Sequence, residues 1–155
     1  AEDTTAARAS GLSLQINDFD RAIALWQMVS VILDTNSVIA YLNGDSEAAK
    51  RIELTPELYL PAIVMGEMVY GAYKSARPER NIKPLKEFSS VCQVIDCGES
   101  AAYEYGRIKN ELKIKGNRIP ENDMWIAACA IAHDLPLLSR DGHFDFVDNL
   151  RRVAW

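Results

Sequence analysis

The stretch Val29-Ser30-Val31-Ile32-Leu33-Asp34 is a short apolar run that ends in an acidic residue. A continuous run of this length is typical of a strand that is buried on both faces of a parallel sheet. Because strands and helices are predicted to alternate, we expect an α/β fold with a parallel sheet and helices on both of its faces. Further strands are predicted at residues 58–60, 91–95, 136–139 and 153–155, and helices at 36–42, 46–52, 61–73, 79–89, 99–115 and 121–133.

The composition of the chain is that of one globular domain. Its 155 residues are 48% hydrophobic and 25% charged, which excludes a disordered or collagen-like chain. A net charge of −5 is unlike that of a general nucleic-acid coat, so contact with nucleic acid would need a local basic patch or metal ions. Three cysteines are too few for a disulfide framework, and no apolar run reaches the roughly 18–20 residues of a membrane span. Since no secretory signal pattern opens the chain, we expect a cytoplasmic protein.

Residues 1–27 differ in pattern from the rest of the chain, and we place a domain boundary directly after them. One interpretation of this segment is an expression or cloning extension. The other is a peptide that docks on the domain 28–155, because Phe19, Ile23 and Trp26 share one face of a predicted short helix. Such a helix is marginal on its own and would need a surface to bind.

Four acidic residues, Asp34, Glu67, Asp123 and Asp141, are singled out by their surroundings. Asp34 and Asp141 follow predicted strands, whereas Asp123 opens an apolar helix and Glu67 lies within another. The carboxyl ends of parallel strands meet at one edge of the sheet, where sites of open α/β folds lie. Carboxylates gathered there would repel one another, and a hard divalent cation such as Mg²⁺ or Mn²⁺ is the usual resolution. Such a site suits hydrolysis of a phosphodiester bond by a water that the metal activates.

Each of these acids also has a plain structural interpretation. Asp34 and Asp123 could cap the helices that follow them, and Asp141 with Gly142 could form a simple turn. Glu67 is harder to explain in this way, because an ionised side chain among apolar neighbours is rarely buried without a partner.

The four acids lie in four segments: Leu-Asp-Thr-Asn-Ser-Val-Ile at 33–39, Met-Gly-Glu-Met-Val-Tyr-Gly at 65–71, Asn-Asp-Met-Trp-Ile-Ala-Ala at 122–128 and Leu-Ser-Arg-Asp-Gly-His-Phe at 138–144. In this order, the segments resemble the motifs of PIN-domain nucleases. The third segment is the most specific, and the resemblance extends over residues 29–155. The fourth segment departs from the family in having Ser139 where Thr is common, but the hydroxyl group is kept. The single-domain form is similar to the VapC toxins of bacterial toxin–antitoxin pairs.

The resemblance implies a three-layer PIN-like α/β fold with a parallel sheet of four to five strands. It also implies an endoribonuclease that depends on Mg²⁺ or Mn²⁺, forms a homodimer and needs no covalent nucleophile. A small VapB-type antitoxin would block it by laying a segment across the active-site groove. Asn36 and Ser139 would support the site by hydrogen bonds. By the same resemblance, the catalytic and metal-binding residues would be Asp34, Glu67, Asp123 and Asp141.

Residues 1–27 have no counterpart in a plain toxin of this kind, so the segment could be a piece of antitoxin. An antitoxin arginine often reaches the toxin carboxylates in this family. Arg8 or Arg21 could do so here, while Phe19 and Trp26 could fill apolar pockets.

Basic residues cluster around the predicted helices at 79–89 and 99–115, which fits either phosphate contacts or a solvated helix face. Arg118 and Arg140 lie near the acidic motifs in sequence and are the better candidates for RNA contact. His143 is a candidate for RNA contact, for metal ligation or for acid–base chemistry, or it is simply a residue of the rim.

Other classes of function fit less well. A phosphatase of the haloacid-dehalogenase type needs a second acid two residues after the one at the strand end, where this chain has Asn36. A receiver domain needs paired acids after the first strand and a late lysine, and neither is present. The alternative that we keep is a PIN fold that has lost catalysis and only binds RNA or a protein.

Overall fold

The computed structural model describes residues 29–155, in which five short strands form one parallel sheet. The strands lie in the order β3-β2-β1-β4-β5, which confirms the predicted parallel sheet. The predicted docking segment at residues 1–27, with Arg8, Phe19, Arg21 and Trp26, lies outside the described residues. The strands are β1 (Val31–Leu33), β2 (Leu58–Pro61), β3 (Gln93–Ile95), β4 (Leu137–Leu138) and β5 (Arg152–Val153).

Helices connect the successive strands, and their ends have clear local causes. The Asp45 carboxylate caps α3 by accepting hydrogen bonds from two backbone N–H groups at 3.0 and 2.9 Å. Pro78 opens α5, and α6 ends at Gly116, whose φ of 72° favours glycine. The helical segments are α2 (Thr35–Leu42), α3 (Ser46–Glu53), α4 (Ala62–Lys74), α5 (Pro78–Ser90), α6 (Glu99–Lys115), α7 (Glu121–Ala132) and the 3₁₀ helix η1 (Gly142–Phe146).

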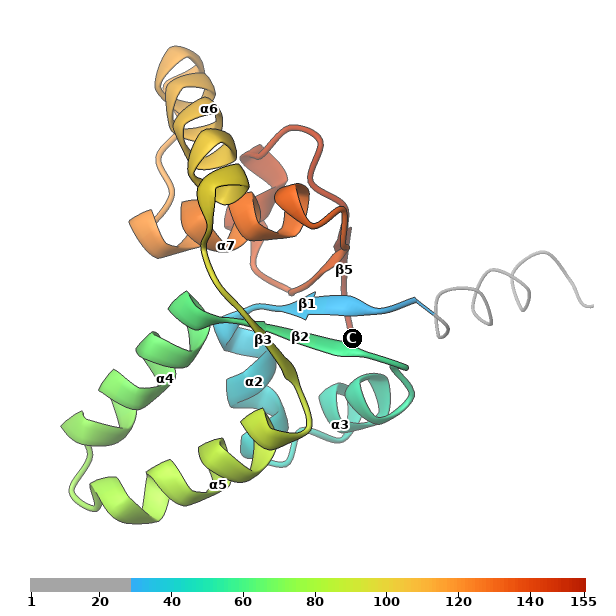
Figure 1. Cartoon of the computed structure of the whole chain (residues 1–155), viewed down its shortest axis with the longest axis vertical. Coiled ribbons are helices and arrows are strands. Elements are labelled where there is room, and N and C mark those ends of the chain that lie inside the picture. The colour runs from blue at the N-terminus through green and yellow to red at the C-terminus, as the bar shows by residue number, and fades with distance from the viewer. Residues whose placement is uncertain (1–28) are drawn as a thin grey trace, which may run out of the picture.

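The order of the strands reverses direction once, and this reversal decides which face each helix covers. From β1 the chain moves outward to β2 and β3, and it then returns past β1 to β4. Crossovers between parallel strands are right-handed, so the two directions place their helices on opposite faces. Figure 1 shows α2 to α5 on one side of the sheet and α6 and α7 on the other. The predicted three-layer arrangement is confirmed.

The point of reversal lies between β1 and β4, which pair in parallel with Leu33 opposite Leu138. Asp34 and Ser139 follow these two residues and therefore leave the sheet next to each other. Ligands of open α/β sheets bind at this edge, beyond the carboxyl ends of the strands on either side of the reversal.

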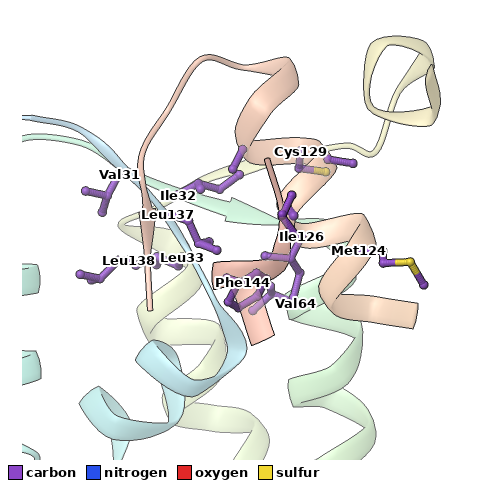
Figure 2. Close-up of a cluster of buried hydrophobic side chains, with 14 of the residues drawn as sticks. Val31, Ile32, Leu33, Val64, Met124, Ile126, Cys129, Leu137, Leu138 and Phe144 are labelled. Atoms are coloured by element: carbon purple, nitrogen blue, oxygen red, sulfur yellow. The ribbon is translucent and has the colours of Figure 1, made fainter. Parts of the chain in front are cut away.

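The central strands are apolar throughout because both of their faces are covered. All residues of β1 and β4 are completely buried. Figure 2 shows three further side chains packed with these strands: Phe144 of η1, Ile126 of α7 and Val64 of α4. Residues 126–130 of α7 form an unbroken buried run, since α7 packs against α6, α4 and η1 as well as the core. The core therefore fixes α7, the helix that begins at the functional edge.

Several element bounds differ from the predicted ones by one or two residues, and the strands predicted at 91–95 and 136–139 are shorter in the structure. The first strand begins at Val31 rather than at Val29, whose side chain is 40% exposed before the sheet starts. The helix η1 follows β4 and was not predicted, because five residues are too few to display a helical period. Within residues 29–155, we find no helix that is long and apolar enough to cross a membrane.

Candidate active site

Ser139 joins the ends of the two central strands. Its hydroxyl donates a hydrogen bond to Oδ2 of Asp34 at 2.6 Å and accepts one from the backbone N–H of Asp141 at 3.0 Å. Asp34 is only 2% exposed, and its side chain makes no capping hydrogen bond to α2. The hydrogen bond from Ser139 therefore fixes the Asp34 carboxylate at the edge of the sheet.

Asp123 and Asp141 meet on the two sides of His143. Nδ1 of His143 lies 3.3 Å from Oδ2 of Asp123 and 3.3 Å from Oδ1 of Asp141. Asp123 lies in the first turn of α7, behind Pro120 at the cap position. Asp141 does cap η1, because it accepts a hydrogen bond from the backbone N–H of His143 at 2.9 Å. Asp141 therefore caps η1 and belongs to the acidic cluster at the same time.

Glu67 is a half-buried side chain of α4 with two hydrogen-bond partners. The side-chain amide of Asn122 donates to its Oε1 at 2.7 Å, and the hydroxyl of Thr35 donates to its Oε2. These contacts link α4 to the start of α7 and to the start of α2. The Glu67 carboxylate is therefore not buried without a partner, which would destabilise the folded protein.

Thr35 and Asn122 received no role from the sequence, although both belong to quoted motifs. The one available signal is their position, since each is the immediate neighbour of a singled-out acid, Asp34 or Asp123. Asn36 does reach the site as a supporting residue, because its amide donates to Oδ2 of Asp141 at 3.4 Å, a long hydrogen bond.

Burial and mutual repulsion raise the pKa values of two of the acids. Burial raises the pKa of Asp34, and the charge of Asp141 adds to this, while the Ser139 hydrogen bond opposes it. Burial raises the pKa of Asp123 to about 6, with further contributions from the charges of Asp34 and Asp141. The edge therefore concentrates negative charge in a partly desolvated place, which a cation would relieve.

The donor atoms fit a divalent cation. Oxygen atoms of Asp123 and Asp141 lie with a ring nitrogen of His143 within 4.8 Å of one another, so one ion could contact all three. Asp34 lies close enough to raise the pKa of Asp123, whereas the Glu67 oxygens are engaged by Thr35 and Asn122. Carboxylate oxygens are the ligands that Mg²⁺ and Mn²⁺ prefer.

Two hollows lie against helices that carry the acids, α4 and α7. One, of about 350 Å³, lies between α2, α4 and α5 and is lined by Thr35 and Glu67 together with apolar side chains such as Ile39, Met68 and Leu85. The other, of about 440 Å³, lies beside the start of α7, and its lining includes three cations. These cations are Lys109, Lys113 and Arg118.

The two arginines named as candidates for RNA contact differ in their surroundings. Arg118 lines the hollow that contains Lys109 and Lys113, called the basic hollow below. Arg140 is engaged with other groups: its Nε donates to the carbonyl of Trp155 at 2.8 Å, its guanidinium pairs with Glu47 at 2.7 Å, and it lies over the Trp155 ring. RNA contact by either arginine stays a prediction.

Comparison with known proteins gives a consistent result. A family model described as PIN domain matches residues 31–150. Ribonuclease VapC2 of Haemophilus influenzae is 36% identical over 131 residues, which cover 83% of this chain and 99% of that protein. The tRNA(fMet)-specific endonuclease VapC of Salmonella typhimurium is 31% identical with the same coverage.

Solved structures give the same result. A chain in the crystal structure of VapBC2 from Rickettsia felis, bound to a DNA fragment from their promoter, has a TM-score of 0.77 and 29% identity. The match covers 82% of this chain and 99% of that one. A chain of DNA-bound VapBC from Salmonella typhimurium has a TM-score of 0.77 and 30% identity, with coverage of 83% and 99%.

Proposed function

The chain belongs to the PIN domain family and, within it, to the VapC ribonucleases, and from this premise we propose that it cuts RNA with the help of Mg²⁺ or Mn²⁺. It is a toxin endoribonuclease of a type II toxin–antitoxin system. The observation that carries the proposed chemistry is the gathering of Asp34, Asp123 and Asp141 where the strand order reverses. Glu67 completes the set from α4.

Asp34, Glu67, Asp123 and Asp141 are the residues that we propose hold the ion. A bound Mg²⁺ or Mn²⁺ would polarise the phosphoryl oxygens and lower the pKa of the attacking water. The protein's own part is to orient the carboxylates before RNA arrives. Each supporting hydrogen bond restricts the conformations of an acidic side chain. The carboxylate oxygens that would bind the metal are therefore already close to the positions that catalysis needs.

Three hydrogen-bonding side chains provide this orientation: Ser139 for Asp34, Asn122 for Glu67 and Asn36 for Asp141. No covalent nucleophile is required, since a water suffices for phosphodiester hydrolysis. Ser139 is also unsuited to attack, because its hydroxyl is fully buried and already donates to a carboxylate.

The basic hollow beside α7 supports a path for the RNA backbone. Met124 of α7 lines this hollow, so the hollow lies against the helix that carries Asp123. Lys109 is already paired with Glu121 at 2.8 Å, whereas Arg118 and Lys113 make no ion pair within the described residues. We propose Arg118 as the principal phosphate contact, with Arg140 as a second candidate.

The partly apolar hollow between α2, α4 and α5 supports the docking of an antitoxin. The solved structures named above are complexes called VapBC, and we propose a VapB-type partner for this chain as well. An antitoxin segment in this hollow would lie against Thr35 and Glu67, and so would cover the edge of the active site. We also propose that residues 1–27 act as such an inhibitory segment, with Arg8 or Arg21 directed at the acids.

We propose in addition that the chain forms a homodimer. Tyr70 and Tyr73 of α4 are 65% and 66% exposed, and Tyr103 of α6 is 75% exposed. Large exposed aromatic side chains are enriched at protein interfaces. We also propose that its substrate is an RNA of the translation machinery and that it therefore acts in the cytoplasm.

The test is RNA cleavage by the full chain and by residues 28–155, each with and without Asp123→Asn. The proteins are incubated with total bacterial RNA in Mg²⁺, Mn²⁺ or EDTA, and new RNA ends are mapped. Cleavage at few sites, lost both in EDTA and in the variant, is the expected result. Failure of a folded, metal-loaded protein to cleave any RNA would instead favour a PIN fold that only binds RNA or a partner.

A further inference from the structure

We propose that His143 is a nitrogen ligand of the metal ion at this edge, so that the site binds Mn²⁺ more tightly than Mg²⁺. This inference rests on the proposed function, because it takes the acidic cluster to be the place of a divalent cation. It adds a residue outside the four acids and a preference among metals.

The geometry of the donor atoms is the first support. In an octahedral site with bonds of about 2.1 Å, neighbouring ligand atoms are about 3.0 Å apart. Nδ1 of His143 lies 3.3 Å from an oxygen of Asp123 and 3.3 Å from an oxygen of Asp141. Both separations are close to those of adjacent ligands, and all three atoms lie within 4.8 Å of one another.

The local backbone is the second support, because η1 delivers the imidazole to the acids. The hydrogen bond from the His143 N–H to Oδ1 of Asp141 turns the chain so that both side chains reach the same place. Phe144, at 2% exposure, anchors this turn in the core. The His143 side chain is 47% exposed, so its ring has room for the small shift that coordination needs.

The preference among metals follows from the chemistry of the nitrogen donor. Mg²⁺ is a hard ion that keeps its waters and favours oxygen ligands. Carboxylates suit both ions, but Mn²⁺ is a first-row transition ion and accepts a nitrogen donor more readily than Mg²⁺ does. An added imidazole therefore contributes more to the binding of Mn²⁺ than to that of Mg²⁺, and a site with the four carboxylates alone would lack this added contribution.

A competing role for His143 is purely structural. In the protein without metal, Nδ1 could donate a hydrogen bond to either carboxylate, and the ring could turn away when the ion arrives. Both roles predict contact with Asp123 and Asp141, so activity measurements alone do not separate them. A direct observation of the metal's ligands does.

The experiment is pulsed electron paramagnetic resonance on Mn²⁺ bound to the full chain, prepared without a histidine tag and with ¹⁵N-labelled histidine. We expect hyperfine coupling from a histidine nitrogen in the wild type. His133→Ala is the matched control, since His133 lies at the end of α7 and its Nδ1 faces the carbonyl of Cys129 at 2.9 Å. The coupling should persist in this control and vanish in His143→Gln.

Titration of the same proteins gives the second readout. His143→Gln should lower the affinity for Mn²⁺ about tenfold, with a smaller effect on the affinity for Mg²⁺. A cooperative thermal unfolding transition in EDTA, at a Tm close to that of the wild type, checks that the variant is folded. Bound Mn²⁺ without nitrogen coupling, or coupling that survives in His143→Gln, would overturn the inference and leave the proposed RNA cleavage standing. If Mn²⁺ binds neither to the full chain nor to residues 28–155, both the inference and the proposed metal dependence are overturned.

Discussion

Replacing Asp123 by Asn should stabilise the metal-free protein while abolishing RNA cleavage. In the folded chain, burial and the charges of Asp34 and Asp141 raise the pKa of Asp123 from 3.8 to about 6. Ionising this group near pH 8 therefore destabilises the folded state by roughly 3 kcal/mol, at about 1.4 kcal/mol for each pKa unit. Because Asn also loses the contact with His143, we expect a net gain of about 1–2 kcal/mol.

The sign of the pH dependence follows from the raised pKa. The stability linked to protonated Asp123 is fully present below its unfolded pKa near 3.8, and it is lost as the pH rises through about 6. Wild type and Asp123→Asn should therefore differ most near pH 7–8 and converge toward about pH 4.

The assay is thermal unfolding of both proteins in EDTA at about pH 8 and about pH 5. A gain of about 1–2 kcal/mol raises the Tm by roughly 2–8 °C in a chain of this size. Asp148→Asn is a matched control that should bring no such gain, because Asp148 is an exposed partner of Lys115. Adding Mn²⁺ should raise the Tm of the wild type and not that of Asp123→Asn. A variant that unfolds below the wild type at pH 8 in EDTA would refute the reasoning.

Three further predictions concern the supporting residues and the leading segment. Asn122→Ala removes the hydrogen bond to Glu67 and should lower the rate of RNA cleavage about 10–100-fold with little change in Tm; an unchanged rate would exclude a positioning role. Ser139→Ala leaves the buried Asp34 carboxylate without its donor and should cost about 1–3 kcal/mol in urea unfolding, whereas Ser139→Thr should retain most of the stability. Removal of residues 1–27 should raise the cleavage rate of the full chain, and equal rates for the two proteins would contradict an inhibitory role.

The sheet and the gathering of acids could be predicted because their signals are local. A strand buried on both faces is a continuous apolar run, as in residues 31–33 and 137–138, and an acid directly after such a run must lie at the edge of the sheet. The reversal between β1 and β4 then brings Asp34 and Asp141 to the same edge. Local patterns were sufficient for the strands and for the acids at their ends, whereas the four acids as one metal site were implied by the resemblance to PIN-domain nucleases.

The contacts that hold Glu67 could not be predicted, because they join distant parts of the chain. Thr35 and Asn122 are 32 and 55 residues from Glu67, and only the packing of α4 against the sheet and α7 brings them together. The placement of His143 depends on η1, whose five residues display no period that sequence analysis could detect. Local patterns predict where an acid leaves the sheet, whereas the hydrogen-bonding roles of Asn36 and Ser139 were implied only by the resemblance to PIN-domain nucleases.

The reversal of the sheet also divides the active site between two consecutive parts of the chain. Asp34 and Glu67 belong to the part that builds β1 to β3, whereas Asp123 and Asp141 belong to the part that adds β4 and β5. The chain passes from one part to the other once, at residues 96–98 between β3 and α6. A fragment from either side of this connection carries only half of the carboxylates. Two harmless halves of the toxin could thus be produced separately, and the nuclease would arise only where they reassemble along β1 and β4.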